Sequence, residues 1–304
     1  MRFGAFVITF NRSQILKQTL EQIFLQTRPP DSILVVDNGN SRETKEIVET
    51  FSRNGSVRYH PMEENVGPAG AAAYAIGRLA SEGYDWIYWG DEDDPPRFPE
   101  TLKRVLTVAE NADTDIAGVG AVGALFSWRT GESVRLSDES LKGNVSVDTI
   151  GGNSQFILRK EAVQAVGVPD ARLFFGHYER EYCLRVRKAG YRFLVDGELM
   201  WKHREIAGRL HLKLSKHLVS EYPFDLIWRR YYRTRNYIFM MNNTFQRPDL
   251  AARETLKALG RVLFVWVRGL KYGIRFTRLQ LQAIWDGYRG RMGRTVLPTP
   301  KVGI

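Results

Sequence analysis

The sequence predicts an α/β fold with a mostly parallel central sheet flanked by helices, followed by a C-terminal region of amphipathic helices. Short apolar runs alternate with stretches of helical periodicity over the first 110 residues, which is typical of βα units. The apolar runs are continuous, as expected of strands that are buried on both faces. The last third instead contains long helical patterns that are dense in Arg and aromatic residues.

The elements follow from these patterns in chain order. In the first half the predicted strands are 3–10, 32–37, 57–60 and 85–90, and the predicted helices are 13–26, 42–51, 68–83 and 98–111. Further along we expect a strand at 117–128, a polar mobile loop at 130–147, a strand and short helix in 151–167, a helix at 179–190 and a strand ending at His203.

The C-terminal region differs in composition and in its predicted secondary structure. Residues 228–245 and 252–294 read as two long helices. On the second helix five basic residues are expected to share one side, with apolar area elsewhere on the helix. These residues are Arg261, Arg268, Lys271, Arg275 and Arg278. A basic, aromatic, amphipathic helix of this kind can lie in a membrane interface.

Charge is divided unevenly along the chain. Residues 1–200 contain 23 Lys and Arg against 28 Asp and Glu, whereas residues 201–304 contain 21 against 6. We therefore expect the C-terminal third to meet an anionic surface. The candidates are lipid headgroups, a pyrophosphate-bearing acceptor and nucleic acid.

The composition also indicates a location. The 304 residues are 43% hydrophobic, enough for a sizeable core, and include one cysteine, Cys183, so no intramolecular disulfide can form. Residues 1–12 do not resemble a signal peptide, and no apolar window reaches the ~18 residues of a spanning helix. We expect a cytoplasmic protein with a peripheral association at the inner face of the cell membrane.

Polar residues gather where the predicted strands end. Thr9 and Asn11 follow the first strand, Asp37 closes the second, Asn65 and Gly67 follow the third, and an acidic run, Asp91 to Asp94, follows the fourth. Ligands of parallel sheets bind beyond the carboxyl ends of the strands. The sequence therefore predicts a site at this edge.

The acidic run has two interpretations. Asp91 and Asp93 can place carboxylates on one Mg²⁺ or Mn²⁺ ion, which often shares its ligands with phosphates. The alternative is a solvated acidic loop. Asp37 can likewise accept the N3–H of uracil or thymine, or it can close an Asx-turn or cap a helix.

Three further side chains are candidates. His203 is either a packing residue or a third metal ligand. Glu179 and Glu181 open a helix, where acidic residues are favoured by the dipole. One of them can instead be a general base toward an acceptor hydroxyl, with His177 as the competing base.

Six segments occur in an order that resembles the inverting family-2 glycosyltransferases of the GT-A fold, over about residues 1–203. They are FVITFNR, ILVVDNGN, ENVGPAG, WGDEDDPP, GGNSQFILRKEAV and FFGHYEREYCLRVRKAGYRF…WKH. The resemblance implies a nucleotide-sugar donor, a divalent metal (Mn²⁺ or Mg²⁺) and a catalytic domain over 1–203. Residues 1–110 would form its nucleotide-sugar half and residues 111–203 its acceptor half.

The resemblance also implies roles for individual positions. On the donor side it implies Thr9, Asn11, Asp37, Asn65, Gly67, Asp91 and Glu92. It implies Asp91, Asp93 and His203 for the metal, Glu179 as the base, and Glu181, His177 and Trp201 on the acceptor side. The chain departs from the family at Glu179, where aspartate is usual. Both side chains supply the carboxylate that the chemistry needs.

The C-terminal region, with RRYYRTRN and WDGYRGRMG, is similar to that of bacterial galactofuranosyl- and rhamnosyltransferases acting on lipid-linked or cell-envelope glycans. No Gln-x-x-Arg-Trp motif is found, which argues against a processive synthase. We expect transfer of galactofuranose, rhamnose or a similar sugar from a UDP- or dTDP-sugar donor to a lipid-linked or oligosaccharide acceptor.

The sequence leaves three alternative functions to consider. A sugar-1-phosphate nucleotidyltransferase would need a glycine-rich, basic loop after the first strand, which VITFNRSQ does not supply. A nucleic-acid-binding protein could use the basic C-terminal third, but no motif for nucleic acid is found and no nucleic-acid partner is expected. An inactive scaffold would have no need of Asp91, Asp93, Glu179 and His203.

Overall fold

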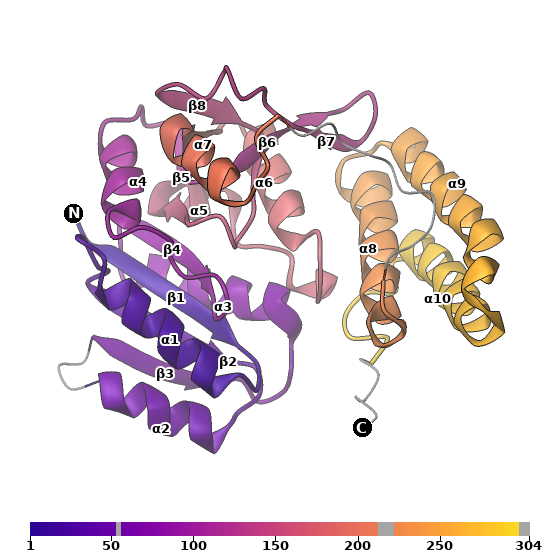
Figure 1. The fold of residues 1–304 in the computed structure, drawn as a ribbon, viewed down its shortest axis with the longest axis horizontal. Coiled ribbons are helices and arrows are strands. Elements are labelled where there is room, and N and C mark those ends of the chain that lie inside the picture. The colour runs from indigo at the N-terminus through magenta and orange to yellow at the C-terminus, as the bar shows by residue number, and fades with distance from the viewer. Residues whose placement is uncertain (53–55, 212–221, 298–304) are drawn as a thin grey trace. The chain divides into compact units, whose positions relative to one another are not determined.

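The computed structural model describes residues 1–52, 56–211 and 222–297 (Figure 1). The described chain divides into two compact units. The first contains residues 1–170 and 179–211, and the second contains residues 171–178 and 222–297. The units are described separately below.

The first unit has eleven strands and seven helices among its described residues. The strands are β1 (Phe3–Thr9), β2 (Ser32–Asp37), β3 (Val57–Pro61), β4 (Trp86–Asp91), β5 (Ile116–Gly120), β6 (Gly123–Ser127), β7 (Glu132–Val134), β8 (Asn144–Val147), β9 (Thr149–Ile150), β10 (Phe156–Arg159) and β11 (Arg192–Asp196). The helices are α1 (Ser13–Phe24), α2 (Arg42–Phe51), α3 (Gly67–Ser81), α4 (Thr101–Glu110), α5 (Lys160–Val166), α6 (Tyr178–Lys188) and α7 (Gly197–Ile206).

An eight-stranded sheet organises this unit, in the order β3-β2-β1-β4-β10-β5-β11-β8. Neighbouring pairs are parallel except those that involve β10 and β8, which run antiparallel. A small second sheet has the order β7-β6-β9. The predicted α/β fold with a mostly parallel sheet is thus confirmed.

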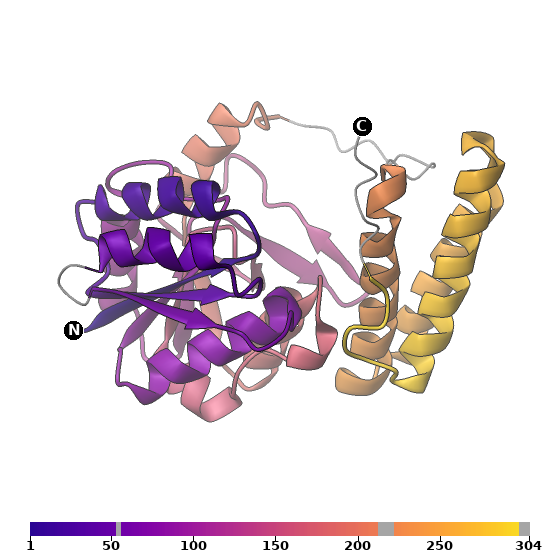
Figure 2. The ribbon, with the colours of Figure 1, turned by 90° about the horizontal axis from the view of Figure 1, so that it is seen from below.

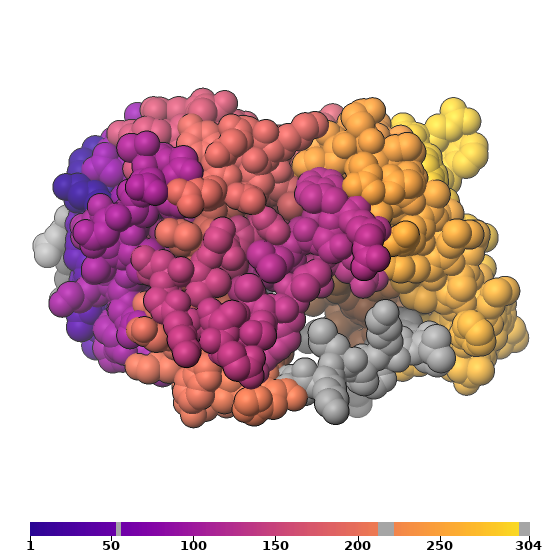
Figure 3. All heavy atoms as spheres, turned by 90° about the horizontal axis from the view of Figure 1, so that it is seen from above, coloured from indigo at the N-terminus to yellow at the C-terminus, as the bar shows by residue number. Residues whose placement is uncertain are grey.

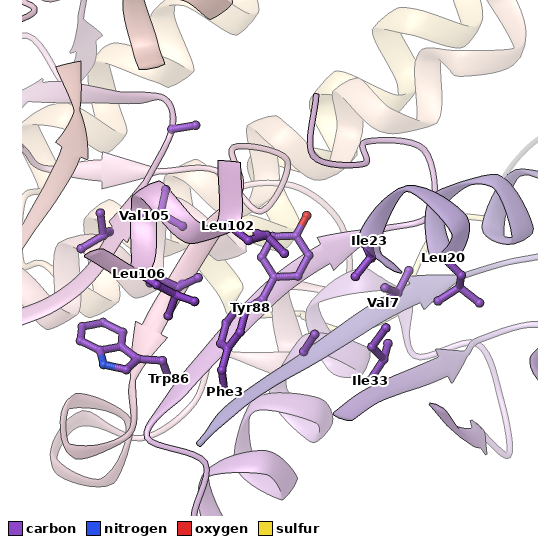
Figure 4. Packing of buried hydrophobic residues seen from close by; sticks show 14 of the residues in the cluster. Phe3, Val7, Leu20, Ile23, Ile33, Trp86, Tyr88, Leu102, Val105 and Leu106 are labelled. Atoms are coloured by element: carbon purple, nitrogen blue, oxygen red, sulfur yellow. The ribbon is translucent and has the colours of Figure 1, made fainter. Parts of the chain in front are cut away.

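Helices cover both faces of the large sheet, with α1 and α2 on one side and α3 on the other (Figure 2). Alternate residues of each strand face opposite sides. On one face, apolar side chains of β1, β2 and β4 pack against α1 and α4 (Figure 4). The labelled members of this cluster are Phe3, Val7, Leu20, Ile23, Ile33, Trp86, Tyr88, Leu102, Val105 and Leu106.

The middle of this unit differs from three expectations. The apolar stretch 117–128 forms two strands, β5 and β6, because the chain leaves the large sheet after Gly120 and β6 pairs in the small one. The expected loop 130–147 contains β7 and β8, and β8 completes the large sheet beside β11. His203 does not end a strand: β11 stops at Asp196, whose side chain caps α7, and His203 lies in that helix.

Asp138 anchors the connection between β7 and β8. Its carboxylate accepts hydrogen bonds from the backbone N–H of His211 (2.9 Å), from Arg135 (2.6 Å) and from the buried Arg204 of α7. The His211 N–H, followed by the two arginines, lowers the pKa of Asp138 to about 2, against the opposing effect of burial. This connection is therefore tied to α7 by charge-assisted hydrogen bonds.

The second unit is helical in its described residues. Its elements are η1 (Ala171–Leu173), η2 (Phe224–Leu226), α8 (Ile227–Phe239), the π-helical turn η3 (Met240–Thr244), α9 (Pro248–Phe264), η4 (Val265–Arg268) and α10 (Leu270–Arg289). The prediction of a single helix over 252–294 was wrong, because the chain turns at η4 and Gly269. Gly269 has φ +97°, a conformation that favours glycine.

The turn also divides the five basic residues that the sequence placed on one helix side. Arg261 lies on α9 and Arg268 in η4, so only Lys271, Arg275 and Arg278 share a helix, α10. Every helix within the described part of the chain is too short or too polar to cross a bilayer.

One buried amide fastens the segment 171–178 to α8. The Asn236 side chain donates hydrogen bonds to the carbonyls of Leu173, Phe175 and Gly176, at 2.8 to 2.9 Å. Buried polar groups are stable only when paired in this way. The segment that enters α6 thus belongs structurally with the C-terminal helices.

We expect Asp138→Asn to lower the melting temperature at neutral pH, because the substitution removes the charge that the two arginines bind. A folded-state pKa of about 2 lies below the ordinary value, so this stabilisation is present above about pH 4 and is lost as the pH falls toward 2. Thermal unfolding of both proteins from neutral pH to pH 2 should show the difference disappear.

The exposed pair Arg247–Asp249 (2.6 Å) provides a control. Asp249→Asn should change the melting temperature little at any pH, because exposed ion pairs contribute about 0–1 kcal/mol. A difference between wild type and Asp138→Asn that stays constant with pH would contradict the assignment.

Candidate functional site

The strand register brings the predicted polar strand ends to one edge of the large sheet. Thr9 lies opposite Asp37, and Asp37 lies opposite Pro61. On the other side of β1, Ile8 lies opposite Asp91. The ends of β1, β2, β3 and β4 therefore form a continuous rim, as the sequence predicted.

Hydrogen bonds link the first three strand ends. The Asn38 backbone N–H donates to the carbonyl of Thr9 (2.9 Å), and its side-chain amide donates to the carbonyl of Gly67 (3.2 Å). The Gly67 N–H in turn donates to Asn65 Oδ1 (2.9 Å). Thr9 is fully buried, and its Oγ1 has no hydrogen-bond partner among the described residues. This part of the rim is preorganised and retains an unused polar atom.

Asp37 has three intramolecular hydrogen bonds. Its Oδ1 accepts from the Gly39 N–H (2.8 Å), and its Oδ2 accepts from the Ser41 N–H (2.8 Å) and the Tyr59 hydroxyl (2.9 Å). Burial and the contact with Asp37 raise the pKa of Tyr59, so Tyr59 acts as a donor. The Asx-turn that the sequence left open is thus present. A carboxylate has about four acceptor positions, so three of these are used within the protein, and Asp37 itself is fully buried.

Negative charge concentrates after β4. Burial, followed by the carboxylates of Glu179, Glu92, Asp93 and Asp94, raises the pKa of Asp91 well above its ordinary value. Burial likewise raises the pKa of Asp94 to about 6 and raises that of Glu92. Carboxylates that repel one another at a partly buried position favour a cation.

Asp93 differs from its neighbours. It is exposed, and its carboxylate pairs with Arg12 at 2.7 Å. Arg12 also lies 3.4 Å from Glu92. A metal ion at Asp93 must therefore compete with this guanidinium.

Glu179, at the start of α6, belongs to the same rim. Its Oε1 accepts from the Gly152 N–H at 3.4 Å, and its charge is the largest carboxylate contribution to the raised pKa of Asp91. The turn 151–155 also supplies Gln155, whose amide donates to Asp94 (3.1 Å). One turn thus contacts both the acidic run and the candidate base.

His203 lies in α7 with its ring edge-on to Phe98, at 5.5 Å between centroids. Burial, followed by the charge of Arg97, lowers the pKa of His203 to about 4, and its Nε2 has no hydrogen-bond partner among the described residues. A neutral imidazole with an unused nitrogen is a competent metal ligand. Trp201, on the same helix, is partly exposed.

The donor set fits a hard divalent cation in two respects: Asp91 lies among other carboxylates, and His203 has an unused nitrogen. Among the described residues, no three His, Cys, Asp or Glu side chains are close enough to surround a metal ion. A metal bound by Asp91, Asp93 and His203 thus requires these side chains to approach one another.

The two acceptor-side candidates near Glu179 have other contacts. Glu181 is buried and forms a two-pronged ion pair with Arg185 (2.6 and 3.2 Å). His177 belongs to the second unit, where its ring lies edge-on to Tyr237. Within the first unit, Glu179 therefore acts on the carboxylates of the rim, whereas Glu181 is held by Arg185.

Arg12, Tyr59, Gly152 and Gln155 were not singled out as site residues from the sequence. Gln155 and Gly152 lie in GGNSQ, within one of the six ordered segments, so a signal for them existed. Arg12 also closes one of these segments, FVITFNR, although its contact with Asp93 spans 81 residues. Tyr59 reaches Asp37 across 22 residues, and it lies in none of the six segments.

A mostly parallel sheet whose carboxyl edge carries polar strand ends and a cluster of carboxylates has the arrangement in which α/β proteins bind ligands. The family model described as Glycosyl transferase family 2 matches residues 5–163, more than half of the chain. The chain belongs to this family and is a glycosyltransferase.

Curated relatives agree with this assignment. The chain is 27% identical over 248 residues to galactofuranosyltransferase GlfT1 of Mycolicibacterium smegmatis, covering 77% of this chain and 82% of that protein. It is 24% identical over 301 residues to GlfT1 of Mycobacterium tuberculosis (strain CDC 1551 / Oshkosh), covering 95% and 94%.

A solved structure supports the GT-A fold. Mannosyltransferase PcManGT from Pyrobaculum calidifontis, in complex with GDP-Man and Mn²⁺, superposes with a TM-score of 0.54 at 13% identity, covering 95% of this chain and 88% of that one. The nucleotidyltransferase, nucleic-acid-binding and scaffold interpretations have no counterpart among these findings.

We expect Gly152→Ala to destabilise the protein by about 1–3 kcal/mol, the usual cost of overpacking a filled site. A Cβ at Gly152 would lie 2.5 Å from Nε1 of the buried Trp89, so the turn that contacts Glu179 must shift. Urea denaturation and transfer rates should both detect this change.

Gly260→Ala is the matched control. It lies within α9, and a Cβ there meets no atom within 4 Å. This variant should gain about 0.5–1 kcal/mol of stability with unchanged transfer. Equal stability of wild type and Gly152→Ala would show that the turn is not tightly packed.

Proposed function

We propose that the protein is a metal-dependent inverting glycosyltransferase. It would move galactofuranose, rhamnose or a similar sugar from a UDP- or dTDP-sugar to a hydroxyl of a cell-envelope or lipid-linked glycan. The single observation that supports this most strongly is the turn 151–155, which contacts Glu179 through the Gly152 N–H and Asp94 of the acidic run through Gln155. Among the sugars, the names of the relatives favour galactofuranose.

We propose that the donor nucleoside binds at the ends of β1 and β2. Thr9 and Asn11 would contact the base and ribose, and Asp37 would accept a hydrogen bond from the base N3–H, which uracil and thymine share. Asn65 and Gly67 would lie near the ribose and diphosphate. The buried, unused Oγ1 of Thr9 supports this assignment, because a native buried hydroxyl normally has a partner.

In this proposal Asp91, Asp93 and His203 hold Mn²⁺ or Mg²⁺, with Glu92 as a supporting residue. The ion would neutralise charge on the departing diphosphate. The two aspartates correspond to the DxD motif of the family that the sequence resembles. In the free protein Asp91 is partly buried among other carboxylates, and their charges repel one another. A bound cation would offset this repulsion.

Glu179 would act as the general base. Its carboxylate would take the proton of the acceptor hydroxyl as that oxygen bonds to the anomeric carbon. The bond from this carbon to the diphosphate oxygen would break on the opposite face, and its electron pair would leave with the diphosphate, so the configuration inverts. Gly152 would hold Glu179 in position through its N–H. Glu181, His177 and Trp201 are the proposed acceptor-side residues.

The basic C-terminal helices are the proposed attachment to an anionic membrane surface. The excess of Lys and Arg after residue 200 supports this attachment, since basic residues near anionic lipids contribute about 1 kcal/mol each. The proposed setting is polysaccharide biosynthesis for the cell envelope, by a cytoplasmic, peripheral membrane enzyme.

We expect UDP or dTDP, together with Mn²⁺ or Mg²⁺, to raise the melting temperature of the protein. A ligand at ~100 times its Kd stabilises by about 2.7 kcal/mol, which corresponds to about 5 °C or more for a chain of this size. EDTA should abolish the shift. Asp91→Asn should lose the shift, and without ligand it should melt no lower than wild type, because it removes a repelled charge.

Asp113→Asn is the control for this experiment. Its side chain is exposed and pairs with Arg192 (3.1 Å), away from the acidic run in sequence. It should retain the full nucleotide and metal response. Wild-type protein whose melting temperature does not respond to either nucleotide with either metal would refute the metal-dependent donor site.

Glu179→Gln should reduce transfer by about 10²–10⁴-fold, the usual contribution of a general base. Gln keeps the shape and an oxygen that can accept from Gly152, so donor binding should stay unchanged. Single-turnover transfer and donor thermal shifts measure the two effects separately. The control is Glu161→Gln, an exposed residue of α5, and transfer by Glu179→Gln within tenfold of wild type would remove the base assignment.

A further inference from the structure

An open cavity of about 550 Å³ lies within the second unit, between η2, α10 and the segment that follows α10. Its lining contains three cations and no carboxylate. The lining residues are Phe224, Lys271, Ile274, Arg275, Arg278, Leu279, Gln282, Thr295 and Val296. None of them belongs to the rim of the sheet in the first unit.

The three cations share one side of α10 because they recur at helical spacing. Phe224 faces two of them: its ring centroid lies 5.4 Å from Lys271 Nζ and 4.9 Å from Arg275 Cζ. Lys271 and Arg278 form no ion pair with any residue in the described ranges. Like charges three and four residues apart destabilise a helix, so this arrangement favours a bound anion.

An exposed apolar stripe runs beside the cations along α10. Its members are Leu270, Ile274, Leu281, Trp285 and Tyr288, and each is between 41% and 70% exposed. They recur at helical spacing on one face, while the core residues Tyr272, Phe276 and Ala283 occupy the opposite face. Tyr288 also has a hydrogen bond to Thr255 of α9 (3.1 Å), and the other four side chains leave apolar surface exposed. In Figure 3 the atoms of the C-terminal helices are coloured orange to yellow by residue number.

Cations directly beside an exposed apolar stripe fit a ligand with an anionic head and a hydrocarbon tail. A second copy of the chain would bring the same cations against themselves, which is unfavourable. A nucleic acid would satisfy the cations but leave the leucines, the isoleucine and the tryptophan in water. Charge complementarity and apolar area together favour the interface of an anionic bilayer.

We propose that this cavity is a headgroup site for a phosphate-bearing membrane lipid. The phosphate would bind Lys271, Arg275 and Arg278, and the hydrocarbon would lie against Ile274 and Leu281. The inference rests on the membrane attachment in the proposed function, and it assigns that attachment to a defined site.

The test uses the full chain and sedimentation with vesicles of phosphatidylcholine, alone or containing phosphatidic acid. Wild type should bind only the acidic vesicles, and added inorganic diphosphate should compete. The double variant Lys271→Gln/Arg278→Gln should bind about 25-fold more weakly, because about 1 kcal/mol for each basic residue corresponds to about fivefold. Unchanged melting temperatures would show that the variant is folded.

Two further variants separate the contribution of the cavity cations from that of positive charge elsewhere and from that of the apolar stripe. Lys17→Gln/Lys45→Gln removes the same charge from exposed positions on α1 and α2, and it should bind within twofold of wild type. Trp285→Ser should weaken binding while leaving competition by diphosphate intact. Binding that survives in the cavity variant, or that falls equally in the control pair, would overturn the headgroup site. So would tighter binding of single-stranded RNA than of the acidic vesicles.

Donor binding is measured on the same samples. The nucleotide and metal response depends on the first unit, so the cavity variant should keep it. If wild type binds the vesicles but shows no such response, the headgroup site stands and the proposed transferase chemistry fails. If wild type shows the nucleotide and metal response but the cavity variant binds vesicles as tightly as wild type, the proposed transferase chemistry stands and the headgroup site fails.

Discussion

The parallel pairing of β1 with β2 on one side and with β4 on the other is the constraint on which the site depends. Each pair is hydrogen-bonded along its whole length, so the carboxyl ends of the strands are held at one edge. Thr9, Asp37 and Asp91 reach this edge from strands that are far apart in the sequence. A slip of one residue in either pair would turn these side chains to the other face of the sheet. The apolar core beneath the helices makes such a slip costly, because residues such as Val7 and Tyr88 would lose the side chains they pack against.

The two units differ in how they carry charge. In the first, Asp91 is held near other carboxylates at a partly buried position, and its pKa is raised as a result. In the second, Lys271 and Arg278 have no carboxylate partner among the described residues. Both arrangements are unfavourable in isolation, and a ligand of opposite charge would relieve each of them. Charged side chains that lack a partner of opposite charge are expected at sites where a protein binds a ligand.

Several features could not be read from local patterns. The division of 117–128 into β5 and β6 depends on which sheet accepts the chain after Gly120, and this is a matter of long-range pairing. The stretch before His203 has apolar residues that suit either a strand or a helix, and the cap supplied by Asp196 decided for the helix. On the basic helices, Gly269 ends one helical run and begins another, so the row of cations is shorter than the sequence suggested.

The sequence alone determined the alternation of strands and helices, the edge at which polar residues collect, and the segregation of basic residues after residue 200. These follow from periodicity and composition, which are local properties of the chain. Only the tertiary structure decided which carboxylates face one another. It placed Glu179 near Asp91, paired Asp93 with Arg12, and filled most of the acceptor positions of Asp37. Such contacts join residues that are distant in sequence, and they exist only once the sheet and its helices have packed.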